Sequence, residues 1–511
     1  MYMTDVYDAW KPLRNYLNTL DIIDTLGVIR AYSVHDALRA APAMPNDIEV
    51  HPWIDRPNAF LPWELETLAR EVVIVCEPSP SPRNTLKRAN SMGSVINKMK
   101  AIEEFIAKHH IGQKNIMHEV SVRLAHRQFK YQTDRPSNES MVRYSKIFGH
   151  PQMIPIVKRK LGLEPKQLFT LGTSMFGNYS QYIGMFYPLE DLSLTGITQA
   201  DYDQFMSLYS KPLDEIKAML TNPSERHLDD QFFYGHHSLY TYPIIFTEIN
   251  GRPAHVCPLP RLLYWRLTSG LYYDLYREKG FDNVFGQAFE EYVGSMLAKT
   301  FDGSGIGIYP GEQNTATSPN RCDWVIDQPD QCLIDECKTK RLTMGAKTSL
   351  LDDKELFEQL GLLGDAVTQA YLSLKAYRDG TYRNPTFTLA AEKKAYICVT
   401  TLEKWYLMGE QIRMLHEIVK EKVVNAGLPV EIIDESPYVV ASIDDMEELA
   451  FLAKSHPLSE LIEPYVSDRL TAGWEYATFL RNNFRDELEH YEYVFGGDLQ
   501  DAYTVTVDEE Q

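Results

Sequence analysis

The nine residues "CLIDECKTK", at positions 332–340, put several charged side chains at the end of a segment that otherwise predicts a buried β-strand. Strand side chains alternate between the two faces of a sheet. Glu336 and Lys338 therefore share one face, while Asp335 and Cys337 share the other. Charge at the end of a buried strand requires partners. The stretch therefore indicates a site rather than ordinary core.

The preceding strand, "CDWVID", is joined to this one by "QPDQ", in which Pro329 suits the first central position of a tight turn. If Pro329 and Asp330 form the turn, the numbers of paired residues sum to 659. Asp323 then lies opposite Glu336, with Cβ atoms about 4.5 to 5.5 Å apart. A slip of one residue would move Asp323 to the other face, so this prediction depends on the loop length.

Two adjacent carboxylates repel each other unless a cation lies between them or one of them is protonated. Oxygen ligands suit Mg²⁺ or Mn²⁺ rather than zinc. A Lys ammonium on the same face could activate a water or hold it in line with a phosphorus atom. The pattern thus predicts a metal-dependent hydrolytic site. The alternative is an exposed strand face on which Glu336 and Lys338 form an ion pair of little energetic worth.

The elements around this pair are predicted in the order helix, three strands, helix, strand, with the strands at "GIGIYP", "CDWVID", "QCLIDECKTK" and "KAYICVT". This order and the residues Asp323, Glu336 and Lys338 resemble the PD-(D/E)XK nuclease superfamily, which includes type II restriction enzymes and Holliday-junction resolvases. The resemblance covers about residues 283–400. Cys322 stands where the family often has Pro.

The resemblance implies specific roles. Asp323 and Glu336 would be metal ligands, the backbone carbonyl of Cys337 a further ligand, and Lys338 the catalytic Lys that assists the attacking water. Glu290, on the preceding helix, would complete the site as ligand and catalytic residue. The alternative for Glu290 is a solvated helix charge, like its neighbour Glu291.

The chain has 511 residues, which is long enough for two to four domains. We expect a multidomain α/β protein. Its segments are a mainly helical recognition or regulatory domain at 1–240, a hairpin and connecting helix at 241–282, a nuclease-like domain at 283–442, and a helical extension with an acidic tail at 443–511. The hairpin is predicted at Asn250-Gly251. Continuous helices are predicted at "ADYDQFMSLYSKPLDEIKAML" and "PRLLYWRLTSGLYYDLYREKG".

Composition narrows the class of protein. Hydrophobic residues make up 44% and charged residues 24%, as in a globular protein, and the six cysteines form no CxxC pair. No apolar run approaches the roughly 18 residues of a membrane span, and the N-terminal sequence lacks the pattern of a secretory signal. We therefore expect a cytoplasmic protein without a membrane partner.

The net charge of −20 argues against binding of nucleic acid over most of the protein surface, but it leaves room for a local basic groove. From Arg83 to Lys130 there are ten Lys or Arg against three Glu. Lys98, Lys100 and Lys108 are the candidate nucleic-acid contacts in this segment. The alternatives are a solvated helix face or docking onto an acidic part of the protein.

The predicted function is Mg²⁺- or Mn²⁺-dependent hydrolysis of DNA, leaving 5′-phosphate ends as the resemblance implies. The hairpin ending in "CPLPRLL", followed by "SGLYYDL" and the helix that carries Glu290, also resembles bacterial defence-associated nucleases. The N-terminal half would recognise substrate, a trigger or a partner protein, with self-association as another option. Two alternatives stay open: a non-catalytic binding module on a nuclease-like scaffold, and an RNase effector.

Overall fold

The computed structural model describes residues 3–38, 44–49, 60–110, 136–181, 196–222, 235–249, 251–311, 322–343, 354–381, 387–407, 409–467 and 473–498, together with residues 128, 194 and 347. The chain divides into two compact units. The first comprises Met1–Lys279 with Asp498–Gln511, and the second comprises Gly280–Gly497. The hairpin segment expected at 241–282 thus belongs mostly to the first unit, and the helices after residue 443 belong to the second.

The first unit is mainly helical. Its helices are α1 (Met3–Leu17), α2 (Ile22–Leu38), α3 (Pro62–Val75), α4 (Ala89–His110), α7 (Asn138–Phe148), α8 (Ile154–Leu161), α9 (Pro165–Gln181), α11 (Gln199–Tyr209), α12 (Leu213–Thr221), α13 (Ser238–Thr241), α14 (Pro260–Leu267), η3 (Ser269–Leu271) and α15 (Tyr272–Leu275). A three-stranded sheet joins β1 (Ser210–Pro212), β2 (Ile244–Ile249) and β3 (Arg252–Val256). The apolar faces of α1 to α4 meet in one core, to which β2 and β3 contribute.

The predicted hairpin in this unit is confirmed. Strands β2 and β3 are antiparallel, and Ile249 pairs with Arg252 across the turn. Gly251 has a φ of 73°, a conformation that glycine adopts without the steric cost of a Cβ. The left-handed conformation of Gly251 therefore suits the turn between these strands.

Two helices predicted as continuous are broken. The segment 200–220 forms α11 and α12 with β1 between them, because Pro212 lacks the N–H that a continuous helix would need. The segment 260–280 forms α14, η3 and α15. A Cβ at Gly270 would lie 2.7 Å from the backbone oxygen of Trp265, so only glycine permits the tight turn after α14.

The second unit is built on a five-stranded mixed sheet in the order β4-β5-β6-β7-β8. The strands are β4 (Gly307–Pro310), β5 (Trp324–Asp327), β6 (Gln331–Lys338), β7 (Lys394–Thr401) and β8 (Tyr438–Ser442). Strands β4, β5 and β6 are antiparallel neighbours, while β6, β7 and β8 run parallel. The mixed α/β class predicted from the sequence is confirmed.

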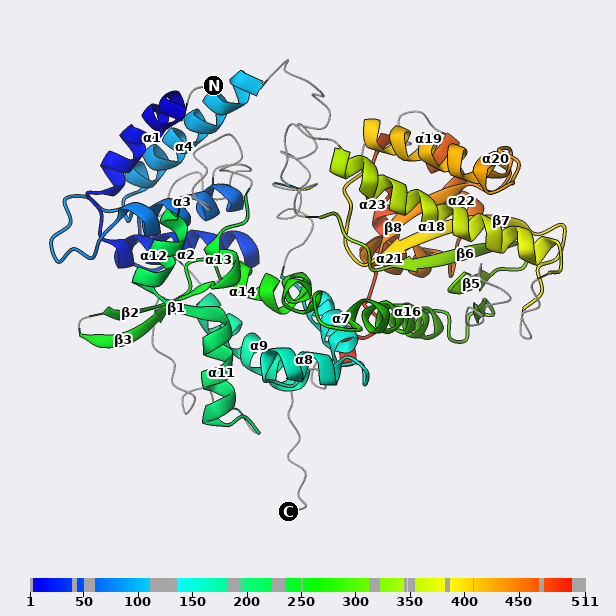
Figure 1. Cartoon of the computed structure of the whole chain (residues 1–511), viewed down its shortest axis with the longest axis horizontal. Helices are drawn as coiled ribbons and strands as arrows, with labels where there is room; N and C mark the ends of the chain where they lie inside the picture. Colours follow the sequence, from blue (N-terminus) through cyan, green and yellow to red (C-terminus); the bar gives the residue numbers. More distant parts are fainter. Residues whose placement is uncertain are drawn as a thin grey trace. The chain divides into compact units, whose positions relative to one another are not determined.

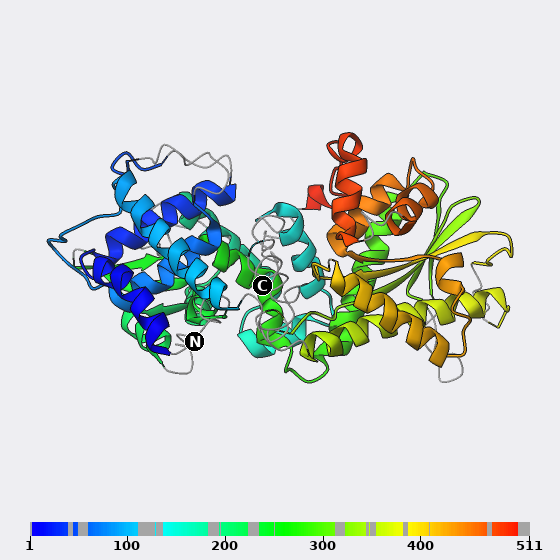
Figure 2. The ribbon, with the colours of Figure 1, turned by 90° about the horizontal axis from the view of Figure 1, so that it is seen from above.

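Helices cover both faces of this sheet. They are α16 (Phe281–Thr300), α18 (Lys354–Arg378), α19 (Glu410–Asn425), α20 (Ile432–Glu435), α21 (Ile443–Leu452), α22 (Leu458–Ser467), α23 (Tyr476–Asn483) and α24 (Arg485–Leu488), followed by the short η5 (Gly496–Asp498). Helices α18 and α19 lie side by side over the face that carries Val325, Ile334 and Ile397 (Figures 1 and 2). Helices α16, α21 and α22 contact the sheet as well.

The order α16, β4, β5, β6, α18, β7 matches the order predicted from the sequence. It places β6 at the centre of the sheet, where both of its faces are buried by helices. No helix within the described ranges combines the length and apolarity that crossing a bilayer requires.

Candidate active site

The hairpin between β5 and β6 has the predicted register. Trp324 pairs with Asp335 and Val325 pairs with Ile334, so the numbers of paired residues sum to 659. The turn is closed by a hydrogen bond of 2.9 Å from the Gln328 N–H to the Gln331 carbonyl. The two-residue loop therefore determined the register, as loop length does in hairpins.

Asp323 lies just before β5, outside the paired residues of the hairpin. Its backbone N–H donates to the carbonyl of Asp335, the partner of Trp324, at 3.0 Å, which is one residue out of the predicted register, so the predicted position opposite Glu336 stays a prediction. Its carboxylate oxygen Oδ2 accepts the backbone N–H of Cys337 at 2.7 Å. Burial raises the pKa of Asp323, although the Lys338 ammonium and the Cys337 N–H favour the ionised form. Asp323 is thus held at the end of β6.

Glu336 is 1% exposed, and its Oε1 forms an ion pair with the Lys338 ammonium. Its Oε2 is buried and has no hydrogen-bond partner among the described residues. Burial, and next the charge of Asp323, raise the pKa of Glu336 well above its usual range. Burial opposes the charge of Lys338, but Glu336 and Asp323 raise its pKa above the ordinary value. The Lys338 ammonium therefore offsets the charge of Glu336 on one oxygen, while the other oxygen has no described partner.

Glu290 reaches the same group of charges from α16. Burial, the Asp323 charge and then Glu291 raise the pKa of Glu290 to about 7, while Lys338 opposes the shift. The indole N–H of Trp324 donates to the Glu290 carbonyl at 3.0 Å and ties this turn of α16 to β5. Glu291 is exposed and accepts a hydrogen bond from Gln287. The structure thus couples Glu290 electrostatically to Asp323 and Lys338.

Asp335 points to the opposite face and lies in a different environment. It is fully buried, and its Oδ1 accepts the Thr400 hydroxyl of β7 at 2.6 Å. The Cys337 thiol lies 3.5 Å from its Oδ2. Burial raises the pKa of Asp335 to about 7, against the hydrogen bond from Thr400. Strand alternation predicted the face of Asp335. It did not predict the partner Thr400, because Thr400 lies on β7, which follows β6 in the sequence only after α18.

A second charged group beside the strand ends was not predicted. Glu403, just after β7, pairs with Arg341 at 2.7 Å and with Lys347 at 3.2 Å. Burial alone would raise the pKa of Glu403, but these two cations hold it below its usual value. Arg341 follows β6, and the parallel ends of β6 and β7 bring the two segments together. That parallel pairing is a long-range feature without a local sequence signal.

The chemistry of the donor set fits a small divalent cation. Asp323, Glu336 and Glu290 offer oxygen ligands, and the buried Oε2 of Glu336 has no other described partner. Among the residues that the structure describes, no group of three or more His, Cys, Asp or Glu side chains is arranged to hold an ion. Glu336 and Asp323 instead contact Lys338 and the Cys337 N–H. An ion would therefore have to compete with these contacts. The Cys337 carbonyl as a ligand stays a prediction.

The candidate nucleic-acid contacts lie on α4 in the first unit. Lys98 donates to the Ser94 hydroxyl at 2.7 Å, and Lys100 lies 3.5 Å from the buried carboxylate of Glu64. The side chain of Lys108, and most of the basic segment beyond it, lie outside the described residues. Any phosphate contact by Lys100 would compete with Glu64.

Comparison with known proteins finds no family model, no curated protein and no solved structure that matches this chain.

Proposed function

We propose that the second unit is a metal-dependent nuclease of the PD-(D/E)XK type that hydrolyses DNA phosphodiester bonds. The observation that carries the proposal is the buried Glu336, which has one oxygen unpartnered among the described residues and Lys338 on its other oxygen. The order of helices and strands around it supports the same proposal. A role in bacterial antiviral defence is part of the proposal and rests on the sequence resemblance alone.

The roles of the residues follow from their charges. Asp323, Glu336 and Glu290 would hold Mg²⁺ or Mn²⁺, which when bound would withdraw charge from the scissile phosphate. Lys338 keeps its proton, since its pKa is raised. It would therefore orient the attacking water and offset developing negative charge, rather than act as the base. Water adds to phosphorus, and the bond from phosphorus to the 3′ oxygen breaks, leaving a 5′ phosphate and a 3′ hydroxyl.

The direct test is cleavage of plasmid, single-stranded DNA and RNA by the full chain with Mg²⁺, Mn²⁺ or a chelator. We expect cleavage of DNA that needs the ion. Cleavage of RNA alone would favour an RNase effector instead. If no nucleic acid is cut with either ion, the second unit is a non-catalytic module, and the proposal fails.

Lys338→Ala provides a sharper version of this test. We expect this variant to retain binding of divalent ions, measured by calorimetry, because the three carboxylates remain. Cleavage should fall by about two to four orders of magnitude, as when a positioned catalytic group is removed. Lys340→Ala is the matched control, because Lys340 lies beyond the end of β6 and is exposed. Normal cleavage by Lys338→Ala would remove Lys338 from the mechanism.

A further inference from the structure

A cavity in the same unit runs along β8, the edge strand of the sheet. Its volume is about 860 Å³, and it is lined by Tyr438, the first residue of β8, as well as by Ser442, the last. This volume is within the range of roughly 300 to 1,000 Å³ of small-molecule sites. Glu336 and Lys338 do not line this cavity.

The walls of the cavity are rich in rings. The aromatic side chains that line it come from the loop after β7, from β8 and from helices α19, α22 and α23, and they are Trp405, Tyr406, His416, Tyr438, Tyr465 and Tyr476. Aliphatic side chains of α19, Ile412 and Leu415, complete one wall. Aromatic faces bind flat rings by offset stacking or edge-to-face contact. Such walls favour a planar ligand.

The loop that forms one side of the cavity has an unfavourable backbone conformation. Tyr406 has a φ of 51°, and within the described part of the chain it alone of the non-glycine residues has a positive φ. Gly409, with φ 52° and ψ −114°, also lines the cavity. For Tyr406, which has a Cβ, this conformation is costly, and such conformations tend to occur at ligand sites, where the surrounding structure maintains them.

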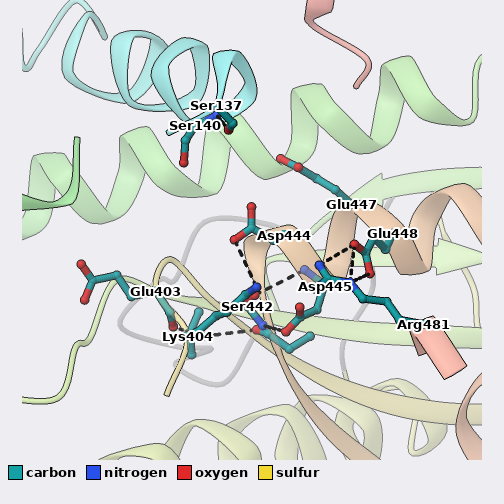
Figure 3. A network of polar contacts seen from close by, with 12 residues as sticks. Ser137, Ser140, Glu403, Lys404, Ser442, Asp444, Asp445, Glu447, Glu448 and Arg481 are labelled. Atoms are coloured by element: carbon teal, nitrogen blue, oxygen red, sulfur yellow. Dashed lines mark hydrogen bonds and ion pairs between the residues drawn. The ribbon is translucent and has the colours of Figure 1, made fainter. Parts of the chain in front are cut away.

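Asp445 supplies a hydrogen-bond acceptor at the cavity. It lies in the first turn of α21, is 2% exposed and lines the cavity. Its Oδ2 caps the helix by accepting the Ser442 N–H at 2.9 Å. Its Oδ1 is buried and has no hydrogen-bond partner among the described residues. An N–H donor on a ligand would satisfy this oxygen. Figure 3 shows Asp445 beside Ser442, Asp444 and Lys404.

The cations of the lining are paired with carboxylates. Lys394 lies 3.6 Å from Glu463, Lys404 lies 4.0 Å from Asp444, and Arg413 pairs with Glu410. The lining itself carries four carboxylates against these three cations: Asp434, Asp445, Glu463 and Glu475. A ligand with several negative charges would therefore be repelled. The charges favour a neutral or weakly cationic molecule.

We infer that this cavity binds a planar heteroaromatic molecule that carries N–H donors and no phosphate, as a purine nucleoside does. The rings of the wall stack on the base, and Asp445 Oδ1 accepts its N–H groups. Guanosine, which presents two adjacent donors on one edge, should bind more tightly than adenosine. This inference does not depend on the nuclease activity, because the two sites share no residue.

Calorimetry of the full chain with guanosine, adenosine and GTP tests the inference. We expect binding of guanosine, weaker binding of adenosine and much weaker binding of GTP. Asp445→Asn retains an oxygen for the Ser442 N–H but places an NH₂ where the ligand needs an acceptor. It should weaken guanosine binding by about tenfold to a hundredfold, as expected for a hydrogen bond to a charged group.

Asp444→Asn is the matched control. It makes the same change of charge in the same turn of α21, but Asp444 does not line the cavity and its side chain is 37% exposed. Its affinity for guanosine should stay within about twofold of the parent, less than the effect of removing one hydrogen bond. Val440→Trp, at a partly exposed position of β8 that lines the cavity, should exclude both nucleosides. Circular dichroism and the melting temperature establish that each variant folds.

A second experiment adds a guanine-containing single-stranded nucleic acid, because the same base could come from a nucleoside or from a nucleic acid. Competition with guanosine would show that the cavity accepts either source, and absence of competition would restrict it to the free nucleoside. The inference is overturned if the parent does not bind guanosine at millimolar concentration. It is also overturned if Asp445→Asn, or Val440→Trp, binds as tightly as the parent.

Discussion

Asp335 and Glu336 are adjacent acids with nearly equal burial, yet strand alternation gives them different partners. Glu336 pairs with Lys338, while Asp335 accepts a hydrogen bond from Thr400 on the other face. Replacing each acid by its neutral amide therefore tests whether Glu336 acts in the reaction and Asp335 does not. Glu336→Gln should abolish cleavage, because a metal ligand loses its charge. Asp335→Asn should leave most of the activity, because an amide oxygen can still accept the Thr400 hydroxyl.

Initial rates of plasmid cleavage at saturating Mg²⁺ measure both variants, with melting temperatures as the control for folding. Equal and complete loss of cleavage in two folded variants would show that Asp335 also acts in the reaction. The assignment of faces would then not separate a structural acid from a catalytic one.

Among single residues, the sequence predicted the positions that depend on local spacing. The two-residue loop determined that Trp324 pairs with Asp335, and the Glu336–Lys338 ion pair agrees with the shared face that strand alternation predicts. The burial of Glu336 and the partner of Asp335 were not predictable. Both depend on β7, which is separated from β6 in the sequence by the whole of α18 and reaches its place through packing.

At the level of elements, the contact between α16 and β5 depends on one glycine. A Cβ at Gly294 would lie 1.9 Å from the Trp324 ring, so a larger residue would force the helix away from the strand. Gly294→Ala should lower the free energy of unfolding by roughly 1 to 3 kcal/mol, as overpacking does. Gly286→Ala, in the same helix with nothing within 4 Å of the new Cβ, should raise it by up to about 1 kcal/mol.

Urea unfolding followed by tryptophan fluorescence measures this pair of variants. Because both make the same change in the same helix, their difference isolates the contact with Trp324. Equal effects in both variants would mean that α16 moves freely relative to β5. In that case Glu290 would not be held near Asp323 by this contact.

The hairpin of the first unit carries a histidine that should make stability depend on pH. His255 on β3 is 6% exposed, and burial lowers its pKa to about 4. The unfolded chain, with a pKa near 6.5, then binds the proton more readily than the folded chain. Stability should therefore be complete above about pH 6.5 and fall as the pH decreases toward 4.

Melting temperatures between pH 4 and 7 measure this effect. His255→Leu should flatten the dependence on pH, while His490→Gln, at an exposed histidine of the second unit, should leave it unchanged. A pH dependence that survives in His255→Leu would assign the effect to other groups.

The boundaries of helices and strands show which structural features the sequence patterns were sufficient to predict. The hairpin at Asn250-Gly251 was predicted because its signal is local. The breaks at Pro212 and Gly270 were missed because the apolar periodicity continues across them. The cavity beside β8 had no sequence signal, because its walls come from segments as far apart in the chain as Lys394 and Tyr476.

For the whole molecule, the net charge of −20 raises the question of how the protein would hold DNA. The basic segment that begins at Arg83 is the proposed contact. Substitution of Lys98, Lys100 and Lys108 by Gln should weaken binding, and removal of each phosphate contact should lower the salt slope of log affinity by about 0.9. Cleavage at saturating DNA should persist, because phosphate contacts of this kind position the substrate without taking part in the reaction.

Gln is preferred to a reversed charge here, because Glu at position 100 would face the buried carboxylate of Glu64. The matched control replaces Lys158, Lys160 and Lys166 of the same unit by Gln. Binding curves at several salt concentrations compare the two triple variants. If the first variant superimposes on the parent, the segment docks within the protein or meets a partner, and the first unit needs another role.

The tight turn between β5 and β6 also affects the order in which the second unit folds during synthesis. A hairpin of this size closes in about 1 to 10 μs, whereas a ribosome adds about 5 to 20 residues per second. Since β6 ends at Lys338 and β7 begins only at Lys394, Asp323 and Glu336 can meet seconds before the strand that buries them has been made. During synthesis the acidic pair is therefore solvated and accessible to ions, and it enters the interior only when β7 and α18 close over it.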